Sequence, residues 1–393
     1  MVNATRSTED HNHLTTVVCA LCAQNSTWNS EVKKRVSKKA RCLPSVRAFL
    51  SNAIHDLPIS EARATRVTVP DVLRRSRSPK CSRDLIIEDP LELGMGPEQR
   101  SLVARLSDLS KVAPVDLNIV IQADHVLVHG LALIATWCER YAANVRIDAK
   151  QKRVQHYLER TGFKKVVEEC VTIDAPLFDQ ENFVALTRID REEQAEADAI
   201  SKRLVDLFER VLGLRDEQKV ALGVLFAELV ENVYRHAQSN CPGYVMAQAH
   251  PDKQKLHVVV ADSGIGVFGS FRQSSSPEIR SRATDERRAI EMALEKLVTS
   301  KVQNHAGYGL YIVKRLVQSN HGWMRLLSGR CTYQTWHEKR PMRGLKLRKE
   351  LTDNLPWRGT EVSLMFDLKE PLPLQSVYRE LGPQRGYEED FFG

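Results

Sequence analysis

Hydrophobic and polar residues follow regular patterns in two parts of the chain, residues 84–172 and residues 196–370. In the first part, the strand-like runs DLNIVIQ and NVRIDA alternate with the helix-like runs VHGLALIATWCERYAA and KRVQHYLERTGF. The first helix has the spacing of an amphipathic helix, and Gly162, a usual C-cap residue, predicts the end of the second. Strand, helix, strand, helix in this order favours a small α/β domain with an open sheet.

Residues 196–370 predict a second and larger α/β unit. Apolar residues from Leu222 to Val233 have helical spacing and predict a helix that includes FAELVENVYRHA. The run KLHVVVA has a strand pattern. A helix begins in GLYIVKRLVQ, and Gly359 and Thr360 open a predicted strand in RGTEVSLMF. The polar segment 267–306 contains the helical run RAIEMALEKLV, and its length is typical of a lid over a ligand. The alternative is a surface helix with flexible flanks.

The segments outside these two units are polar, and one of them is strongly basic. Residues 1–83 contain 15 Lys or Arg and 6 Asp or Glu, a net charge of +9, so the rest carries −2 of the overall +7. We expect a disordered tail there, and the alternative is an arm that contacts nucleic acid or an acidic partner. The near-neutral remainder argues against a broad nucleic-acid footprint. Residues 173–195 predict an acidic linker, and residues 371–393 a loose C-terminal tail.

Composition narrows the class of protein. A hydrophobic content of 42% and a charged content of 27% are typical of a globular protein. The sequence contains no apolar run of about 18 residues, so no membrane span is predicted. The apolar patch around Val17–Leu21 is short, so a signal peptide is not predicted either. The eight cysteines have no regular spacing, which favours reduced thiols and a cytoplasmic location. Cys19 and Cys22 form a C-x-x-C pair, but the sequence offers no second pair of ligands for zinc and leaves metal binding there open.

Four short motifs follow one another in the second unit. The first lies in the predicted helix 226–237, where Glu228 and Asn232 are four residues apart and Arg235 and His236 follow. This spacing places their side chains on one face of the helix. An amide oxygen suits Mg²⁺, a guanidinium suits phosphate oxygens, and a carboxylate can orient or deprotonate a water. Taken alone, the same spacing is typical of a solvated helix surface.

The second motif, Asp262-Ser-Gly264-Ile-Gly266, directly follows the predicted strand. A carboxylate at the end of a strand can accept a hydrogen bond from an exocyclic amine, and glycines let the backbone approach a ligand closely. Together with Gly269 these glycines also imitate the dinucleotide-binding pattern, which requires the glycines to open a helix. The following residues, SFRQSSSPE, predict a loop and therefore argue against that alternative.

The third motif places Gly307 and Gly309 at the start of a predicted helix, followed by Leu310. A glycine-rich turn that opens a helix presents free backbone N–H groups and the positive end of the helix dipole, which together favour an anion. The sequence lacks Gly-Lys-Ser/Thr, so a Walker A loop is excluded. The fourth motif is Gly359-Thr360, whose hydroxyl can reach a base or a bound water.

In this order, E-x-x-x-N, D-x-G-x-G, G-x-G-L and G-T resemble the GHKL superfamily of ATP-binding domains over residues 196–368. That superfamily includes DNA gyrase B, the ninety-kilodalton heat-shock chaperone, sensor histidine kinases and anti-sigma kinases. The resemblance implies a C-terminal two-layer α/β sandwich that binds ATP and Mg²⁺. It also implies a role for each matching residue: Asn232 holds Mg²⁺, Arg235 contacts phosphate, Glu228 activates water in the ATPase members, Asp262 binds the adenine amino group, Gly264 and Gly266 pass close to the nucleotide, Gly307, Gly309 and Leu310 form the phosphate turn, and Thr360 lies near the base.

Residues 112–165 resemble the STAS-like domains of bacterial regulators. In that family a phosphorylatable Ser or Thr often precedes the first long helix, whereas this chain has ADHVLVHG there, so phosphorylation at this turn is not expected. His125 and His129 lie four apart in the same stretch, a spacing that can bind a metal on a helix. The sequence shows no third ligand, and we interpret both as ordinary surface or core histidines.

We therefore expect an ATP-binding regulatory protein in which Mg-ATP in a GHKL-type pocket controls a protein partner. The alternatives are a Ser/Thr protein kinase of the anti-sigma type and a slow ATPase linked to nucleic acid through the basic N-terminal segment. The sequence has no phospho-acceptor histidine box, which disfavours an autophosphorylating histidine kinase. It leaves open whether ATP is hydrolysed, transferred or only bound, what the partner is, and whether the chain dimerises.

Overall fold

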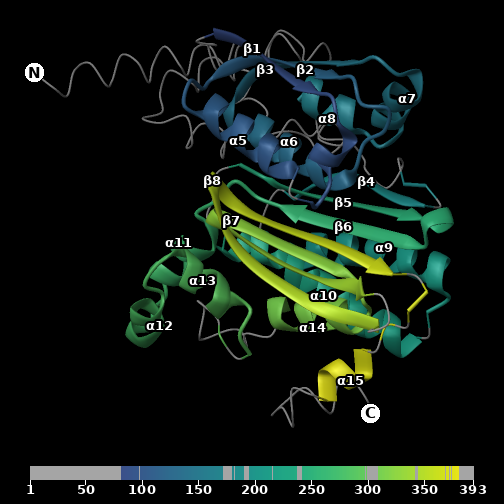
Figure 1. Cartoon of the computed structure of the whole chain (residues 1–393), viewed down its shortest axis with the longest axis vertical. Coiled ribbons are helices and arrows are strands. Elements are labelled where there is room, and N and C mark those ends of the chain that lie inside the picture. Colours follow the sequence, from purple (N-terminus) through teal and green to yellow (C-terminus); the bar gives the residue numbers. More distant parts are fainter. Residues whose placement is uncertain are drawn as a thin grey trace, which may run out of the picture.

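The computed structural model describes residues 81–96, 98–170, 179–180, 182–189, 194–214, 216–236, 241–296, 298, 309–340, 344–367, 369–370, 372 and 374–379. Two sheets lie one above the other, with helices between them and beneath the lower sheet (Figure 1). Cys19, Cys22 and nearly all of the expected N-terminal tail lie outside the described residues. Within the described part, no helix combines the length and hydropathy needed to cross a membrane.

The upper sheet is parallel and belongs to the N-terminal unit. Its strands follow the order β1-β2-β3, and β1 begins at Cys81, slightly before the expected boundary at residue 84. In β2 buried apolar residues alternate with half-buried ones, Asp116, Asn118 and Val120, as the strand pattern predicts. The predicted helix in KRVQHYLERTGF ends at Arg160, and Gly162 follows it with φ +72°, so the predicted end of this helix is confirmed. The elements are β1 (Cys81–Ile87), η1 (Pro90–Leu93), α5 (Gln99–Ser110), β2 (Val115–Ile121), α6 (Val128–Tyr141), β3 (Ala142–Ala149), α7 (Lys152–Arg160) and α8 (Phe163–Glu168).

Helix α6 is buried on every side, whereas the sequence pattern predicts an amphipathic helix. Every residue from Val128 to Glu139 is buried, because α6 lies between the two sheets and contacts β5 and β6 of the lower one (Figure 1). A helix enclosed in this way needs apolar residues around its whole circumference. Gly130 is required where α6 meets η1, since a Cβ there would lie 2.5 Å from the Leu93 Cα.

The lower sheet has five strands in the order β4-β5-β6-β8-β7, and every neighbouring pair is antiparallel. Its edge strand β4 lies inside the expected linker 173–195 and is buried along its whole length. The linker prediction is therefore wrong for this segment: the turn residues around FVALTRI mark the ends of a strand that is covered on both faces. The strands are β4 (Phe183–Ile189), β5 (Gly243–His250), β6 (Lys255–Ala261), β7 (Trp323–Arg340) and β8 (Gly344–Asp367), with η3 (Pro251–Lys253) between β5 and β6.

Long helices cover the lower sheet on the face opposite α6 (Figure 1). They are α9 (Gln194–Leu212), α10 (Asp216–His236) and α14 (Gly309–Ser319). Phe208 of α9 packs against Phe226 of α10 and edge-on against Phe366 of β8, with ring centroids 5.2 and 5.1 Å away. The expected loose tail is wrong for its first part, because α15 (Leu374–Arg379) buries Val377 in this core. Together these elements confirm the expected α/β sandwich.

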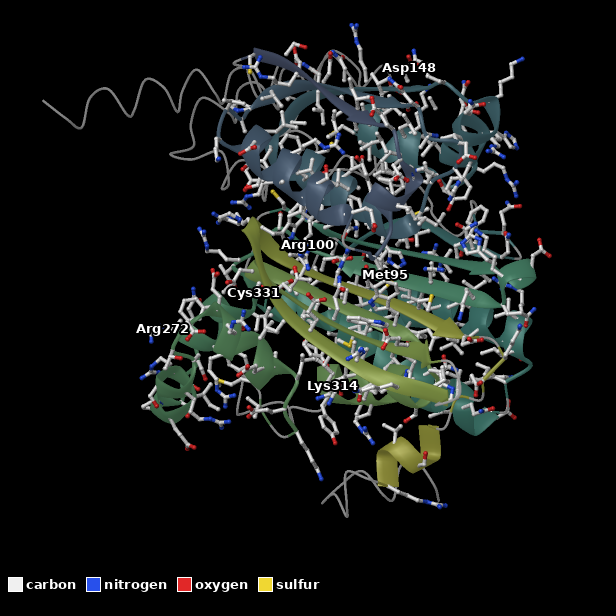
Figure 2. The ribbon with its side chains drawn as sticks, in the orientation of Figure 1. Met95, Arg100, Asp148, Arg272, Lys314 and Cys331 are labelled. Carbon is white, nitrogen blue, oxygen red and sulfur yellow. The ribbon has the colours of Figure 1, made fainter. Side chains whose placement is uncertain are left out.

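Among its described residues the segment after β6 forms three helices; the sequence predicts only the last of them, in RAIEMALEKLV, and a loop in SFRQSSSPE. The three helices are α11 (Gly266–Arg272), α12 (Pro277–Arg282) and α13 (Glu286–Ala293). Ser276 caps α12 by accepting from the Ile279 N–H, and Pro277 occupies the first turn, so the serine-proline pair marks a helix start. Phe271 and Met292 share a small apolar cluster within this segment. Figure 2 shows Arg272 on this outlying lobe, away from the two sheets.

Strand β8 also differs from the prediction. Gly359 and Thr360 lie inside a strand that already begins at Gly344, rather than at its start. The pairing with β7 is irregular beside them, between Ser328 and Cys331, and Gly359 has φ +105°. This irregularity is a bulge-like kink that brings β8 against the end of β6.

Candidate nucleotide-binding site

The loop after β6 brings the second and fourth motifs together. Asp262 directly follows β6, and its backbone N–H donates to the Thr360 carbonyl at 2.8 Å. Gly266 begins α11, so these glycines do open a helix, and the reason given above for rejecting the dinucleotide pattern is wrong. The pattern fails for another reason: β6 is antiparallel to both of its neighbours, whereas a dinucleotide fold needs a parallel βαβ unit.

Asp262 is a buried carboxylate with few polar groups around it. Its side chain is 6% exposed, and its Oδ1 accepts from the Gly264 N–H at 2.7 Å. Burial raises the pKa of Asp262 to about 7, although backbone hydrogen bonds from Gly264 and Thr360 oppose the rise. Among the described residues no cation forms an ion pair with it. Such a carboxylate is suited to accept a hydrogen bond from a ligand's N–H group.

Two glycines allow the backbone to pack tightly around Asp262. A Cβ on Gly359 would lie 2.0 Å from the Asp262 carbonyl oxygen, so only glycine fits there. A Cβ on Gly266, which has φ +71°, would lie 2.8 Å from the Ser328 Oγ. That same Ser328 hydroxyl accepts from the Val267 N–H at 2.9 Å and fixes the start of α11. The loop is thus held in place by residues of β7 and β8.

The first and third motifs also meet. A Cβ on Gly309, the first residue of α14, would lie 2.6 Å from the Glu228 Oε2, so that carboxylate sits at the positive end of the α14 dipole. Asn232 lies one turn further along α10, on the same face as Glu228, and both side chains are half-buried. Leu310 packs against the main apolar core. Gly307 and the side chain of Arg235 lie outside the described part, so their roles stay predictions.

Contacts that the sequence does not indicate fasten the lobe α11–α13 to the rest of the unit. Lys314 of α14 donates to the Leu294 carbonyl at 2.6 Å, at the end of α13, and lies 5.0 Å from the Tyr311 ring centroid. Burial lowers the pKa of Lys314 to about 8. Glu286 accepts from the Arg330 N–H of β7 at 2.8 Å. Figure 2 shows Lys314 on the helical side of the lower sheet. The polar side of an amphipathic helix gives only a weak signal for such contacts.

A residue of the N-terminal unit touches the loop directly. Arg140, near the end of α6, donates to the Ser263 carbonyl at 3.1 Å. This contact joins residues 123 positions apart, and no local pattern predicts it. The N-terminal unit therefore reaches the backbone next to Asp262.

The family model for the histidine kinase-like ATPase domain matches residues 191–322, which include α9, α10, β5, β6, the lobe α11–α13 and α14. This part of the chain is therefore similar to ATPase domains of the GHKL type, which supports nucleotide binding. The match ends before β7 and β8, which contribute Thr360 and the glycine that packs on Asp262. No curated protein matches the chain.

Proposed function

We propose that this chain is an ATP-binding regulatory protein and that Mg-ATP bound at the Asp262 loop controls a protein partner. The observation that carries the proposal is the buried Asp262 carboxylate, which a glycine loop surrounds and which has no cationic partner among the described residues. An adenine amino group supplies the N–H donor that this carboxylate lacks. The similarity of residues 191–322 to histidine kinase-like ATPase domains supports the same ligand.

The other motif residues fit the phosphate end of a nucleotide. Asn232 offers an amide oxygen, a hard ligand suited to Mg²⁺, and Arg235 follows on the same helix. When bound, Mg²⁺ neutralises charge on the phosphate oxygens. The start of α14 at Gly309 adds backbone N–H groups that favour an anion. Glu228 lies at that helix start and is the candidate for orienting a water.

Calorimetric titration of the full chain with ATP, with and without Mg²⁺, tests the proposal. We expect saturable Mg-dependent binding that Asp262→Asn abolishes, because an amide would present an N–H where the carboxylate accepts one. Asp252→Asn is the matched control, since Asp252 is exposed and lies just before β6 rather than after it. The proposal fails if the wild-type chain binds no ATP at millimolar nucleotide, or if both variants bind it equally well.

The fate of the bound ATP separates the proposal from its alternatives. A regulatory binder releases little phosphate, whereas phosphate release that Glu228→Gln abolishes would show an ATPase. Transfer of labelled γ-phosphate to a serine or threonine of another protein would show a kinase of the anti-sigma type. A second candidate, an ATPase linked to nucleic acid, requires turnover that added DNA or RNA stimulates and that deletion of residues 1–80 makes independent of nucleic acid.

A further inference from the structure

A cavity of about 690 Å³ lies between the N-terminal unit and the end of the lower sheet. Helices α5 and α6 form one wall, and the loop that follows Asp262 forms part of the other, together with β7 and β8. Cavities of about 300–1,000 Å³ are typical of small-molecule sites. Among its lining residues are four aromatic side chains, Trp137, Tyr141, Phe268 and Trp357.

The aromatic walls come from both units of the chain. Trp137 and Tyr141 lie one turn apart on α6, with ring centroids 5.4 Å apart, and Trp357 lies in β8. The Trp137 indole N–H is already used, since it donates to the Leu106 carbonyl at 2.8 Å. Aromatic faces on two sides of a cavity favour a planar ligand that stacks between or against them.

Two lining residues carry buried polar atoms that lack a hydrogen-bond partner among the described residues. They are the Trp357 indole nitrogen and the Ser263 hydroxyl, on side chains that are 5% and 2% exposed. Leaving a buried donor unpaired costs about 1–3 kcal/mol, so such groups normally find a partner. A ligand with hydrogen-bond acceptors would supply one, because the indole N–H can only donate.

The charged residues of the wall favour an anion. Lys111 and Arg358 are cations, and Glu286 is the single carboxylate among the lining residues. Glu286 already accepts from the Arg330 N–H, while Lys111 pairs with Asp108 only at the exposed surface. An exposed pair of this kind is weak and leaves the lysine able to turn to another anion.

We propose that this interdomain cavity is a second ligand site, one that takes a planar aromatic anion, with the Trp357 indole N–H and the Ser263 hydroxyl as its hydrogen-bonding groups. The site adjoins the proposed nucleotide site, because the loop after Asp262 borders both, but it takes a different ligand. Asp262, Thr360, Glu228 and Asn232 do not line the cavity, although Gly264 and Gly266 border it. The inference does not depend on ATP binding, since it rests on the aromatic walls, the unpaired polar atoms and the two cations of the wall.

Fluorescence titration of the full chain with 1-anilinonaphthalene-8-sulfonate, an aromatic sulfonate with a planar naphthalene ring, tests the proposal. We expect one saturable site per chain, with energy transfer from tryptophan and no displacement by saturating Mg-ATP. Ser110→Trp places an indole in the cavity from α5 and should weaken binding at least ten-fold. Ser101→Trp adds the same side chain at an exposed position of the same helix that does not line the cavity, and should leave binding unchanged.

A second variant keeps the test decisive if Ser110→Trp does not fold. Trp357→Phe retains an aromatic ring and removes only the N–H donor, so the dissociation constant should rise about three- to ten-fold, as expected for one hydrogen bond. The proposal is overturned if the dye shows no saturable binding, if Mg-ATP displaces it, if a folded Ser110→Trp binds it like wild type, or if Trp357→Phe leaves its affinity unchanged.

Discussion

The two faces of the lower sheet are buried by different chemistry. The face toward α9, α10 and α14 meets an apolar core, in which Phe208, Phe226 and Phe366 pack ring against ring. The face toward α6 includes Arg325 and Glu361 among its apolar residues, and His129 lies opposite them on α6; each of these three is at most 2% exposed. Apolar contacts are non-directional, whereas buried polar groups need their partners at fixed positions. The second face therefore specifies how the N-terminal unit docks.

The polar groups on that face form one hydrogen-bonded chain across the interface. Ser363 donates to Glu361, so its oxygen accepts from the His129 Nδ1–H at 2.8 Å. His129 then presents its Nε2 as an acceptor to the His257 Nδ1–H at 2.7 Å. This order of donors assigns the tautomers of both histidines.

Arg325 and neighbouring side chains extend the chain to the backbone of the N-terminal unit. Its guanidinium pairs with both carboxylate oxygens of Glu361, at 2.9 Å and 2.5 Å, and also donates to the Gly94 carbonyl at 3.4 Å. Gln334 donates to the Met95 carbonyl at 3.0 Å, and Figure 2 shows Met95 above the lower sheet. Bidentate pairs of this kind fix orientation as well as charge.

The largest effect should come from breaking the central ion pair of the polar face. Arg325→Met leaves the fully buried Glu361 without its cation and should lower the free energy of unfolding by about 3–5 kcal/mol. Denaturant titration measures the loss. The double variant Arg325→Met/Glu361→Leu should recover most of it, because it leaves no unpaired charge. If the single variant matched wild type, the polar face would not decide how the units dock.

Asp262, the central residue of the proposed nucleotide site, offers the opposite case, a buried carboxylate without an ion-pair partner among the described residues. Burial raises its pKa from 3.8 to about 7, so the folded chain binds the proton more tightly than the unfolded chain. Ionisation therefore costs stability as pH rises through this window, at most about 4 kcal/mol above pH 7. Asp262→Asn should stabilise the ligand-free chain at pH 8 and should not do so near pH 4. Denaturant titrations at several pH values test this, and an equal effect at every pH would contradict it.

The histidines should make the polar face sensitive to acid. Burial lowers the pKa of His129 well below its usual value, with His257, Arg325 and His250 adding repulsion, and burial lowers the pKa of His257 to about 3. Because the pKa of each histidine is lower in the folded chain than in the unfolded chain, the unfolded chain takes up protons first as pH falls. The free energy of unfolding is therefore highest above pH 6.5 and decreases as pH falls below that value. His257 should therefore contribute a loss of about 2 kcal/mol between pH 6.5 and pH 5, and His129 should add to the loss in the same direction.

His257→Gln isolates one of these two contributions. Glutamine keeps an N–H donor for His129 but does not titrate, so the loss of stability between pH 6.5 and pH 5 should fall by about 2 kcal/mol while stability at pH 8 changes by about 1 kcal/mol or less. Thermal unfolding between pH 5 and pH 8 provides the measurement. An unchanged pH profile would mean that His257 is not the titrating group.

The smallest effect should lie at the rim of the same interface. Arg100 contacts Glu350 at 3.5 Å and the Thr352 hydroxyl at 3.3 Å, but the Arg100 and Glu350 side chains are 48% and 43% exposed. Figure 2 shows Arg100 beside the β7–β8 end of the sheet. Arg100→Ala should cost about 0.5 kcal/mol or less. A loss above about 1 kcal/mol in the same denaturant assay would show that the rim contributes as the centre does.

The apolar face and the loop motifs were accessible from the sequence because their signals are local. The helical stripe of α10, the strand pattern of β6 and the glycines after it each occupy a few consecutive residues. The polar face was not accessible in this way. His129 has the same local pattern whether it is an ordinary core histidine or a link between two units, and its partner Ser363 is 234 positions away.

The same distinction explains two of the wrong predictions. Strand β4 is recognisable only once both of its faces are seen to be covered. The continuous strand around Gly359 depends on pairing with β7, since glycine and proline nearby favour a strand boundary when the segment is considered alone. In both cases the deciding contacts come from residues distant in sequence.

The enclosure of α6 has a consequence for how the molecule unfolds. Its residues share one apolar cluster with Tyr244, Met246 and Val259 of the lower sheet, so neither sheet can open without exposing this helix. The two units should therefore melt in a single cooperative transition, and the slowest amide exchange in α6 should proceed only through global opening. A nucleotide bound beside Asp262 would then protect amides of the N-terminal sheet that it never touches.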